Sequence, residues 1–314
     1  MSANGGEPQS GQSSLATNVH DTACGFGALA AGATSGISGG ATAFGYGAFA
    51  VGENSTTVGS FGGTAANVAG VTSIGANANS TTGLVGIYST AIGAGSDPSA
   101  LLEVLSRGNY SVAIGGGDGV GATPARSQGT RSVAIGGSTA ANSTDSTVVG
   151  SNSTVTGNNS GSFGTGNTIN GTSSIANGSS NSITGGSSGA FGTSNTVNAN
   201  GSYAIGVSNT VTGPRAIAVG IFTTVLGDSA AGVGDTATAS GRIASAFGAL
   251  ANAGGLFGNE GTTALGSGAQ AGTGASGQTY ATAIGGNAQA QGANAVAIGG
   301  NIGSGAGFAA YASA

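Results

Sequence analysis

The chain has 314 residues, of which 67 are glycine, and only 5% of its residues are charged. The formal net charge is −5 and lysine is absent, so the chain has no basic stripe for a nucleic acid or an anionic membrane. No apolar run reaches the roughly 18 residues of a membrane-spanning helix. One histidine and ten scattered acidic residues form no triad, phosphate-loop or zinc pattern. We therefore expect a non-enzymatic protein without a cofactor or a metal.

Residues 1–20 contain glycine, proline and glutamine but no apolar anchor, and they predict a flexible lead-in. His20, the only histidine, lies in this lead-in. The polar residues after Met1 do not form a signal peptide. Either an export signal has been removed, or the chain is a fragment of a longer protein.

The next region, residues 21–134, predicts coils that carry loops. Residues that directly precede a glycine, which we term anchors, recur here at uneven spacing: Cys24, Phe44, Val58, Ile74, Ile92 and Ile114. Gaps longer than 14 residues, up to 22, separate most of them. Each excess indicates a loop at an exposed corner, where repeat proteins often carry binding sites. We expect Cys24 to be a small buried residue rather than a reactive thiol.

The largest insertion lies between Ile92 and Ile114 and contains the segment 97–107. Pro98 near the start of this segment and Gly108 after its end predict a short helix. Four aliphatic residues within five positions need a cover, which the roll or a neighbouring molecule could supply. We predict a partner-binding loop whose candidate residues are Asp97, Leu101, Leu102, Glu103, Leu105 and Arg107.

Residues 135–248 repeat with a constant period of 14. Their anchors, which we predict to be structural, are Ile135, Val149, Phe163, Asn177, Phe191, Ile205, Val219, Val233 and Phe247. A fixed short period is typical of a solenoid, in which each repeat forms one coil stacked on the previous coil. The sequence therefore predicts an all-β solenoid with coils of about 14 residues.

The segment 132–136, Ser-Val-Ala-Ile-Gly, is the template of each repeat, and its alternation of β-branched and small residues indicates a short strand. Side chains two positions apart share one face of a strand. We predict that the anchors point into the coil and that the small residues before them, such as Ala134, face outward against another backbone. Asn177 should then meet a backbone group or a bound ion or water in the roll interior, or its copies in neighbouring chains, because an unpaired buried amide costs about 1–3 kcal/mol.

A second apolar position follows each anchor by six residues, as in Val155, Ile169, Ile183 and Val197. Glycines beyond it mark a second corner, so each coil should contain two short strands and two turns. Asn-Thr pairs before this position, such as those at 167–168 and 195–196, are interpreted as polar turns. Residues 249–314 should continue the coils with longer loops and end in a C-terminal tail. Such thin coils bury little apolar surface, which favours association of several chains.

The Ser-Val-Ala-Ile-Gly segment, the period of 14 and the second glycine-bounded strand resemble the head domain of trimeric autotransporter adhesins, the YadA-like family, over residues 22–303. The resemblance implies a left-handed parallel β-roll and a homotrimer. It also implies display on the outer membrane of a Gram-negative bacterium. The implied activity is adhesion to extracellular matrix proteins, host glycans, cells or abiotic surfaces, with roles in virulence and biofilm formation.

Some members of that family bind collagen through an Asn-Ser-Val-Ala-Ile-Gly-x-x-Ser pattern. The closest segments here, 131–139 and 110–118, do not begin with Asn or end with Ser, and the roll itself requires the same residues. The family's coiled-coil stalk and membrane anchor are not visible in this sequence.

Two other functions stay open beside an adhesin head. The chain could be a structural fibre segment without a ligand of its own. It could also bind ice through a flat threonine array, for which we find only an isolated Thr-x-Thr at 236–238.

Overall fold

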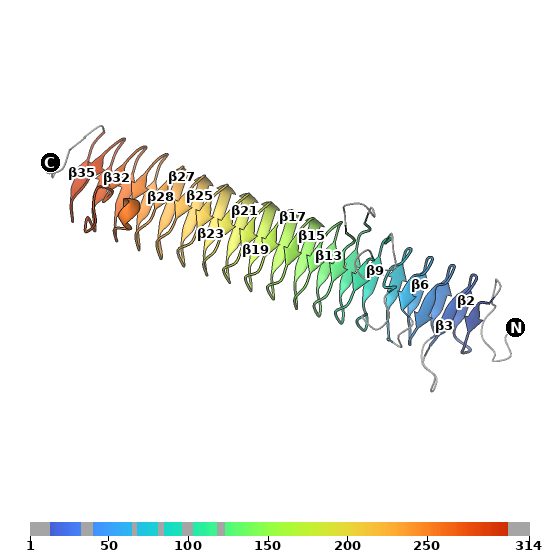
Figure 1. The fold of residues 1–314 in the computed structure, drawn as a ribbon. Coiled ribbons are helices and arrows are strands. Elements are labelled where there is room, and N and C mark those ends of the chain that lie inside the picture. Colours follow the sequence, from blue (N-terminus) through green and yellow to red (C-terminus); the bar gives the residue numbers. More distant parts are fainter. Residues whose placement is uncertain are drawn as a thin grey trace. The chain divides into compact units, whose positions relative to one another are not determined.

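The computed structural model describes residues 13–32, 40–64, 68–80, 85–95, 103–117 and 123–300. The chain divides into two compact units, residues 1–166 and residues 167–314, which are described separately below. In both units a strand of one sheet is followed by a strand of a second sheet, and the chain then returns to the first sheet (Figure 1). The prediction of an all-β solenoid is confirmed: the strands pair in parallel with the next coil, and the described residues contain no α-helix.

In the first unit, the first sheet contains nine short parallel strands. They are β2 (Thr22–Cys24), β4 (Thr42–Phe44), β6 (Thr56–Val58), β8 (Thr72–Ile74), β9 (Thr90–Ile92), β11 (Val112–Ile114), β13 (Val133–Ile135), β15 (Thr147–Ser151) and β17 (Gly161–Thr165).

The second sheet of this unit has two pieces. One piece consists of β1 (Leu15–Ala16), β3 (Leu29–Ala31), β5 (Phe49–Val51) and β7 (Gly63–Thr64); the other consists of β10 (Leu105–Ser106), β12 (Arg126–Ser127), β14 (Ala140–Ala141) and β16 (Thr154–Val155). Because β1 pairs with β3, the roll begins at Leu15. The prediction that the whole of residues 1–20 is a flexible lead-in is therefore wrong for this strand.

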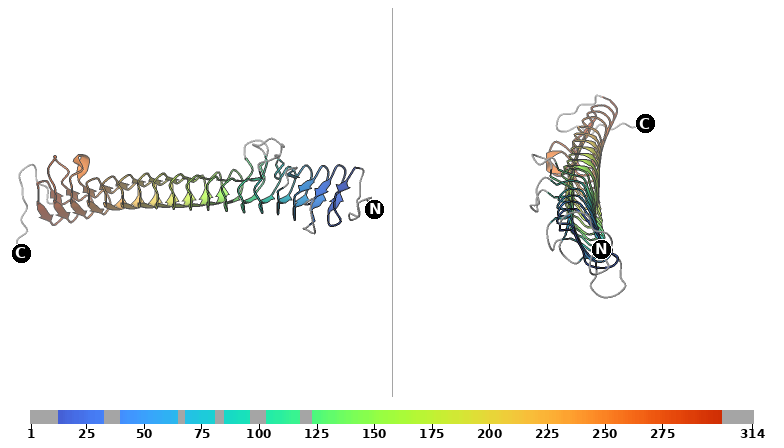
Figure 2. Two further views of the ribbon diagram at one scale, coloured as in Figure 1. Left: turned by 90° about the horizontal axis from the view of Figure 1, so that it is seen from below. Right: turned by 90° about the vertical axis from the view of Figure 1, so that its right-hand side faces the viewer.

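The second unit is more regular. Its first sheet consists of β19 (Ile175–Ser179), β21 (Gly189–Thr193), β23 (Tyr203–Val207), β25 (Ile217–Ile221), β27 (Ala231–Asp235), β29 (Ser245–Phe247), β31 (Thr263–Leu265), β33 (Thr282–Ile284) and β35 (Val296–Ile298). Its second sheet consists of β18 (Thr168–Ile169), β20 (Ser182–Ile183), β22 (Thr196–Val197), β24 (Thr210–Val211), β26 (Thr224–Val225), β28 (Thr238–Ala239), β30 (Asn252–Ala253), β32 (Gln270–Ala271) and β34 (Gln289–Ala290). A 3₁₀ turn, η1 (Gly255–Phe257), projects from one corner (Figure 2).

The glycine after each anchor is required by the stacking of the coils. Gly206 has a φ of 123°, and a Cβ atom built on it would lie 2.0 Å from the carbonyl oxygen of Gly220 in the next coil. Any other residue would be strained in this conformation and would also collide with the backbone. The anchors themselves are aligned, for example Phe191 with Ile205 and Ile205 with Val219, which confirms the period of one coil per 14 residues.

The faces of the first sheet are opposite to those predicted. The small residue before the anchor points into the coil, and Ala134, Ala176 and Ala204 are 0% exposed. The anchors lie on the outer face, where Phe163 is 41% and Ile205 is 42% exposed. The alternation of sides is as expected, but the interior already contains the Val or Ile of the second strand and mostly holds a small residue opposite it, with Val148 as the larger exception. Cys24, also an anchor, is only partly buried.

Asn177 is oriented like the other anchors. It is exposed on the outer face of β19 and is aligned with Phe191 of β21. The prediction that its amide meets a polar partner inside the coil is therefore wrong. Its polar side chain is tolerated because this face is open to solvent in the single chain.

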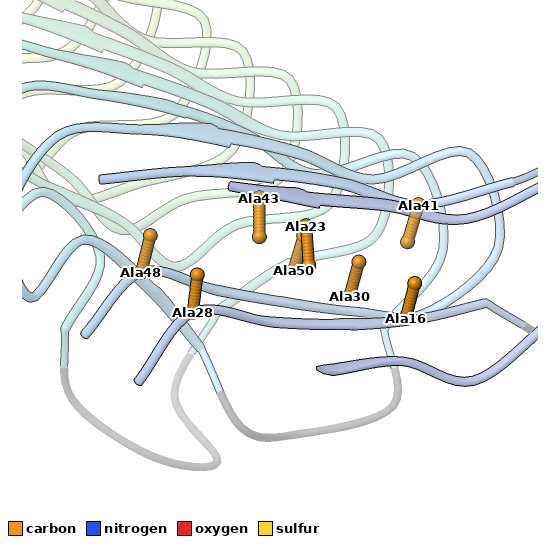
Figure 3. Packing of buried hydrophobic residues seen from close by; sticks show 8 residues of the cluster. All are labelled: Ala16, Ala23, Ala28, Ala30, Ala41, Ala43, Ala48 and Ala50. Atoms are coloured by element: carbon orange, nitrogen blue, oxygen red, sulfur yellow. The ribbon is translucent and has the colours of Figure 1, made fainter. Parts of the chain in front are cut away.

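Two kinds of interior result from this arrangement. In the second unit, buried Ile and Val residues of the second sheet face the buried alanines; they are Ile169, Ile183, Val197, Val211 and Val225. In the first coils of the first unit, alanines from both sheets point toward one another and fill the interior almost alone (Figure 3). They are Ala16, Ala23, Ala28, Ala30, Ala41, Ala43, Ala48 and Ala50.

The predicted helix at 97–107 is wrong where the structure describes it. Leu105 and Ser106 form β10, which pairs with β12 of the next coil. Glu103 and Leu105 are completely buried, and Glu103 accepts a hydrogen bond of 2.8 Å from Ser80. Neither residue can contact a partner, because the roll itself covers them. Asp97, Leu101 and Leu102 lie outside the described residues, and Arg107 is partly buried.

Candidate functional site

In each unit the outer face of the first sheet carries a row of aligned apolar anchors, which we term the apolar face; in the second unit Asn177 interrupts the row. In the second unit it includes Tyr203, Ile205 and Val207 of β23, which align with Ile217, Val219 and Ile221 of β25. Ile221 is 45% exposed, a high value for a large apolar side chain. Contiguous exposed apolar surface of this kind marks a site of association in soluble proteins.

The same face is apolar in the first unit. Phe44 of β4 is 55% exposed and aligns with Val58 of β6, which aligns with Ile74 of β8. The anchors of the sequence analysis therefore form a surface instead of a core. The small residues that were expected to face another chain are the ones that fill the coil.

An asparagine ladder, which we define as Asn167, Asn181, Asn195 and Asn209, runs along one corner of the second unit. All four side chains are buried. The Oδ1 atoms of the first three accept both the backbone N–H and the side-chain amide of the asparagine one coil later, as for Asn195 on Asn181 at 3.1 and 3.0 Å. Asn209 Oδ1 accepts the backbone N–H of Thr223. Each Nδ2 also donates to a glycine carbonyl, as Asn195 does to Gly206 at 2.9 Å. The amides are satisfied on both sides, so burial carries no unpaired group.

A serine ladder occupies the other corner. The hydroxyl of Ser188 accepts the backbone N–H of Ser202 at 3.2 Å and donates to the carbonyl of Ala199 at 2.8 Å. Ser174 and Ser202 repeat this arrangement. The sequence analysis interpreted the asparagines as exposed turn residues and missed both ladders. The signal for them was present, since the same polar residue recurs at the period of the coil.

Exposed aromatic rings stack on neighbouring coils of the first unit. The ring centroids of Phe26 and Tyr46 are 5.6 Å apart, those of Tyr46 and Phe61 are 5.1 Å apart, and those of Tyr88 and Tyr110 are 5.7 Å apart. Two of these pairs are nearly parallel, so much of their ring surface is directed at each other. This stacking supports the corners of the coils and leaves mainly ring edges for a partner.

Asp21 caps the first described coils. It is completely buried and accepts hydrogen bonds from the backbone of Ala41 at 2.8 Å and of Gly32 at 3.1 Å, and from the hydroxyl of Thr17 at 3.0 Å. Burial alone would raise the pKa of Asp21, but these hydrogen bonds outweigh it and hold the pKa below its usual value.

Of the other described charges, Glu103 is buried and Arg107 and Arg126 are partly buried, whereas the ion pairs lie at the surface. Arg131 pairs with Asp145 at 2.6 Å and Arg215 with Asp228 at 2.7 Å, in each case between neighbouring coils. The hydrogen bond from Arg131 lowers the pKa of Asp145. Exposed ion pairs of this kind contribute little to stability. No group of three or more His, Cys, Asp or Glu side chains that could hold a metal occurs among the residues described.

The segments that most nearly match the collagen pattern lie on β11 and β13. Val133 and Ile135 lie on the apolar face, whereas Ala134 is buried. Tyr110 is exposed and stacks on Tyr88. Both segments thus use their apolar residues as the rest of the roll does. Asp118, at the end of the second segment, lies outside the described residues.

A stack of short parallel coils with glycine corners, polar ladders and one apolar outer face defines a parallel β-solenoid repeat protein. The family model of the YadA head domain repeat matches residues 39–61, 127–153, 141–167, 198–222 and 275–301. Matches to this repeat recur across the chain and support a YadA-like adhesin head domain, as the sequence resemblance implied. No curated protein matches it.

The part of the chain that the structure describes contains no helix that is both long and apolar enough to cross a membrane.

Proposed function

We propose that the chain is the head of a cell-surface adhesin, forms a left-handed β-roll in a homotrimer and acts without catalysis at the outer membrane surface of a bacterium. Its targets would be extracellular matrix proteins, glycans, cells or abiotic surfaces. The family match supports the class of function. The observation that carries the oligomer is the apolar face, which is in register from coil to coil.

Association through the apolar face would compensate for the small interior of each coil. A coil between β18 and β27 buries one Ile or Val of the second sheet and one Ala, or a Gly, of the first sheet, whereas the later coils bury Ala on both sheets. Large apolar residues on the outside, such as Ile205 and Ile217, would gain roughly 25 cal/mol for each Å² that a neighbouring chain covers. Asn177 would then lie at the interface, where the same residue of two neighbours could supply its hydrogen bonds.

The oligomer is tested by sedimentation equilibrium of the purified chain. We expect a trimer, and we expect Ile205→Glu to weaken it strongly, because a buried carboxylate without a partner is very unfavourable. Thr210→Glu, on the outer face of the second sheet, is the matched control and should leave the trimer intact. A stable wild-type monomer would contradict the homotrimer.

Adhesion is tested separately by surface plasmon resonance on immobilised matrix proteins and glycans. Binding to any of them, saturable and specific, supports the adhesin head. If the trimer forms but binds no surface, the structural fibre segment becomes the better description. The regular coils between β18 and β28, which carry no inserted loop, suit that second function.

A further inference from the structure

A shallow polar depression lies at one corner of the second unit, where the second sheet returns to the first. Three successive coils form it, between β18 and β19, β20 and β21, and β22 and β23. We term it the corner groove. Its volume is about 460 Å³, within the range of roughly 300–1,000 Å³ typical of small-ligand sites. The side chains that line it are those of Asn170, Thr172, Thr184, Ser187 and Asn200.

Two glycines create the corner groove. Gly186 occupies the position that is Thr172 one coil earlier and Asn200 one coil later. A Cβ atom on Gly186 would lie 3.2 Å from the Thr172 hydroxyl and 3.6 Å from Asn200 Oδ1, so it would fill the space between them. Gly201 opens the neighbouring position in the same way before Arg215 of the next coil. The corner groove thus lies where glycines interrupt the rows of side chains that align from one coil to the next.

Hydrogen bonds hold the walls in place. The backbone N–H of Gly186 donates to Asn200 Oδ1 at 2.7 Å, and the hydroxyl of Thr184 donates to Asn198 Oδ1 at 3.2 Å. With its oxygen engaged, Asn200 carries its two N–H donors at the edge of the groove. A fixed amide beside several hydroxyls requires little reorganisation to bind a ligand.

The chemistry of the walls selects the class of ligand. They consist of amide and hydroxyl groups and include no charged and no aromatic side chain. The nearest arginine, Arg215, has both Asp228 oxygens within 2.7 Å of its Nη2 atom. An acidic ligand would therefore find no free cation, whereas a neutral ligand with many hydroxyl groups could exchange hydrogen bonds with every wall.

We propose that the corner groove binds an uncharged oligosaccharide. This inference rests on the proposed adhesin function and names the class of its partner. Hydrogen bonds from Asn200, Asn170 and the hydroxyls would orient a sugar ring above the groove, with one of its hydroxyl groups at the position of the missing Gly186 side chain. One shallow site binds weakly, but a trimer would present three copies, and multivalent attachment raises the apparent affinity without new contacts.

The same corner argues against ice as the ligand. Threonines of the second sheet do align, as Thr196 with Thr210 and Thr210 with Thr224, so the array is more extensive than the segment 236–238 suggested. However, the neighbouring columns contain asparagine, Leu226 and a concave depression. Contact with a flat crystal surface requires an even face.

The test compares Gly186→Ala with the wild-type chain on an array of neutral, sialylated and sulfated glycans. Gly186 does not have a left-handed φ, so alanine fills the groove without backbone strain. We expect the wild type to bind one or more neutral glycans and Gly186→Ala to lose at least tenfold in apparent affinity. Gly292→Ala is the control, because its Cβ would contact only Ala295, at 3.6 Å, at the same corner of a later coil. Equal melting temperatures establish that both variants are folded.

Three results would overturn the proposal: neutral-glycan binding that Gly186→Ala leaves unchanged, binding restricted to charged glycans, or inhibition of ice growth without glycan binding. Binding to matrix proteins with no glycan signal would reject the corner groove but keep the adhesin function. Absence of binding to any surface would reject both.

Discussion

The first coils of the first unit and the regular coils of the second unit use the same corner positions differently. In the second unit these positions are the asparagine and serine ladders, such as Asn195 and Ser188. In the first coils the corresponding residues are alanines, including Ala28, Ala48 and Ala41. The ladders lie in coils of constant period, but alanine corners such as Ala230 and Ala237 keep the same period of 14 through Phe247, so the ladders are not required for it. Stacking of the coils requires only the backbone and small residues, whereas the ladders occur in coils whose period is constant.

The largest expected loss of stability should occur in both units. Gly206→Ala and Gly45→Ala each place a Cβ within 2.3 Å of a backbone oxygen in the next coil, at a φ of 123° and 135°. We expect each to lower the free energy of unfolding by about 3–5 kcal/mol, measured by urea denaturation. Gly161→Ala, whose Cβ would lie 3.5 Å from the Phe163 ring, should cost less than about 1 kcal/mol. A small effect in one unit alone would show that its coils do not depend on this stacking.

A substitution in the asparagine ladder should destabilise the second unit more than a substitution at the corresponding corner destabilises the first unit. Asn195→Ala leaves the backbone N–H of Asn209 without an acceptor, while the side-chain amide of Asn209 keeps Ile205 and Gly220 as acceptors. The bonds that Asn195 itself donates to Asn181 and Gly206 are also lost, so we expect a loss of about 2–4 kcal/mol. Ser153→Ala, at the corresponding corner of the first unit, removes hydrogen bonds of 3.1 and 3.3 Å and should cost about 1 kcal/mol. Thermal unfolding followed by circular dichroism measures both. Equal losses would mean that the ladder adds nothing to the second unit.

The smallest expected effect is a dependence of stability on pH in the first coils. The pKa of Asp21 is lower in the folded chain than its ordinary value of 3.8. Its contribution is therefore complete above pH 3.8 and is lost as the pH falls through the lower folded pKa. We expect acid to destabilise the wild type more than Asp21→Asn, which should be less stable near neutral pH. Hydrogen exchange at Ala41 and Gly32, whose N–H groups bind this carboxylate, measures the difference. Identical acid responses of the two chains would contradict this role of Asp21.

The sequence predicted the period, the strand pairs and the glycine corners because these depend on spacing along the chain. It did not predict which face of the first sheet is inside. Alternation places Ala204 and Ile205 on opposite sides, but only the width of the coil decides which of them fits the interior. The helix expected at 97–107 failed for a similar reason, since the register of Leu105 with Arg126 depends on the neighbouring coil. The asparagine ladder was visible as a repeated residue, yet burial could not be inferred from a polar side chain.

The asparagine ladder gives the stack a direction. Each Oδ1 accepts from the coil after it, and at the far end the backbone N–H of Thr223 donates to Asn209 Oδ1 at 2.9 Å. Each Nδ2 also donates to a glycine carbonyl further along the chain, as Asn195 does to Gly206. A completed coil therefore displays a carbonyl oxygen that only the next coil can satisfy. Cutting the chain between two of these coils would leave unpaired Oδ1 and Nδ2 atoms on one cut surface and their partners, N–H groups and a glycine carbonyl, on the other. The two broken ends would be complementary, so each could serve as a template for the missing half.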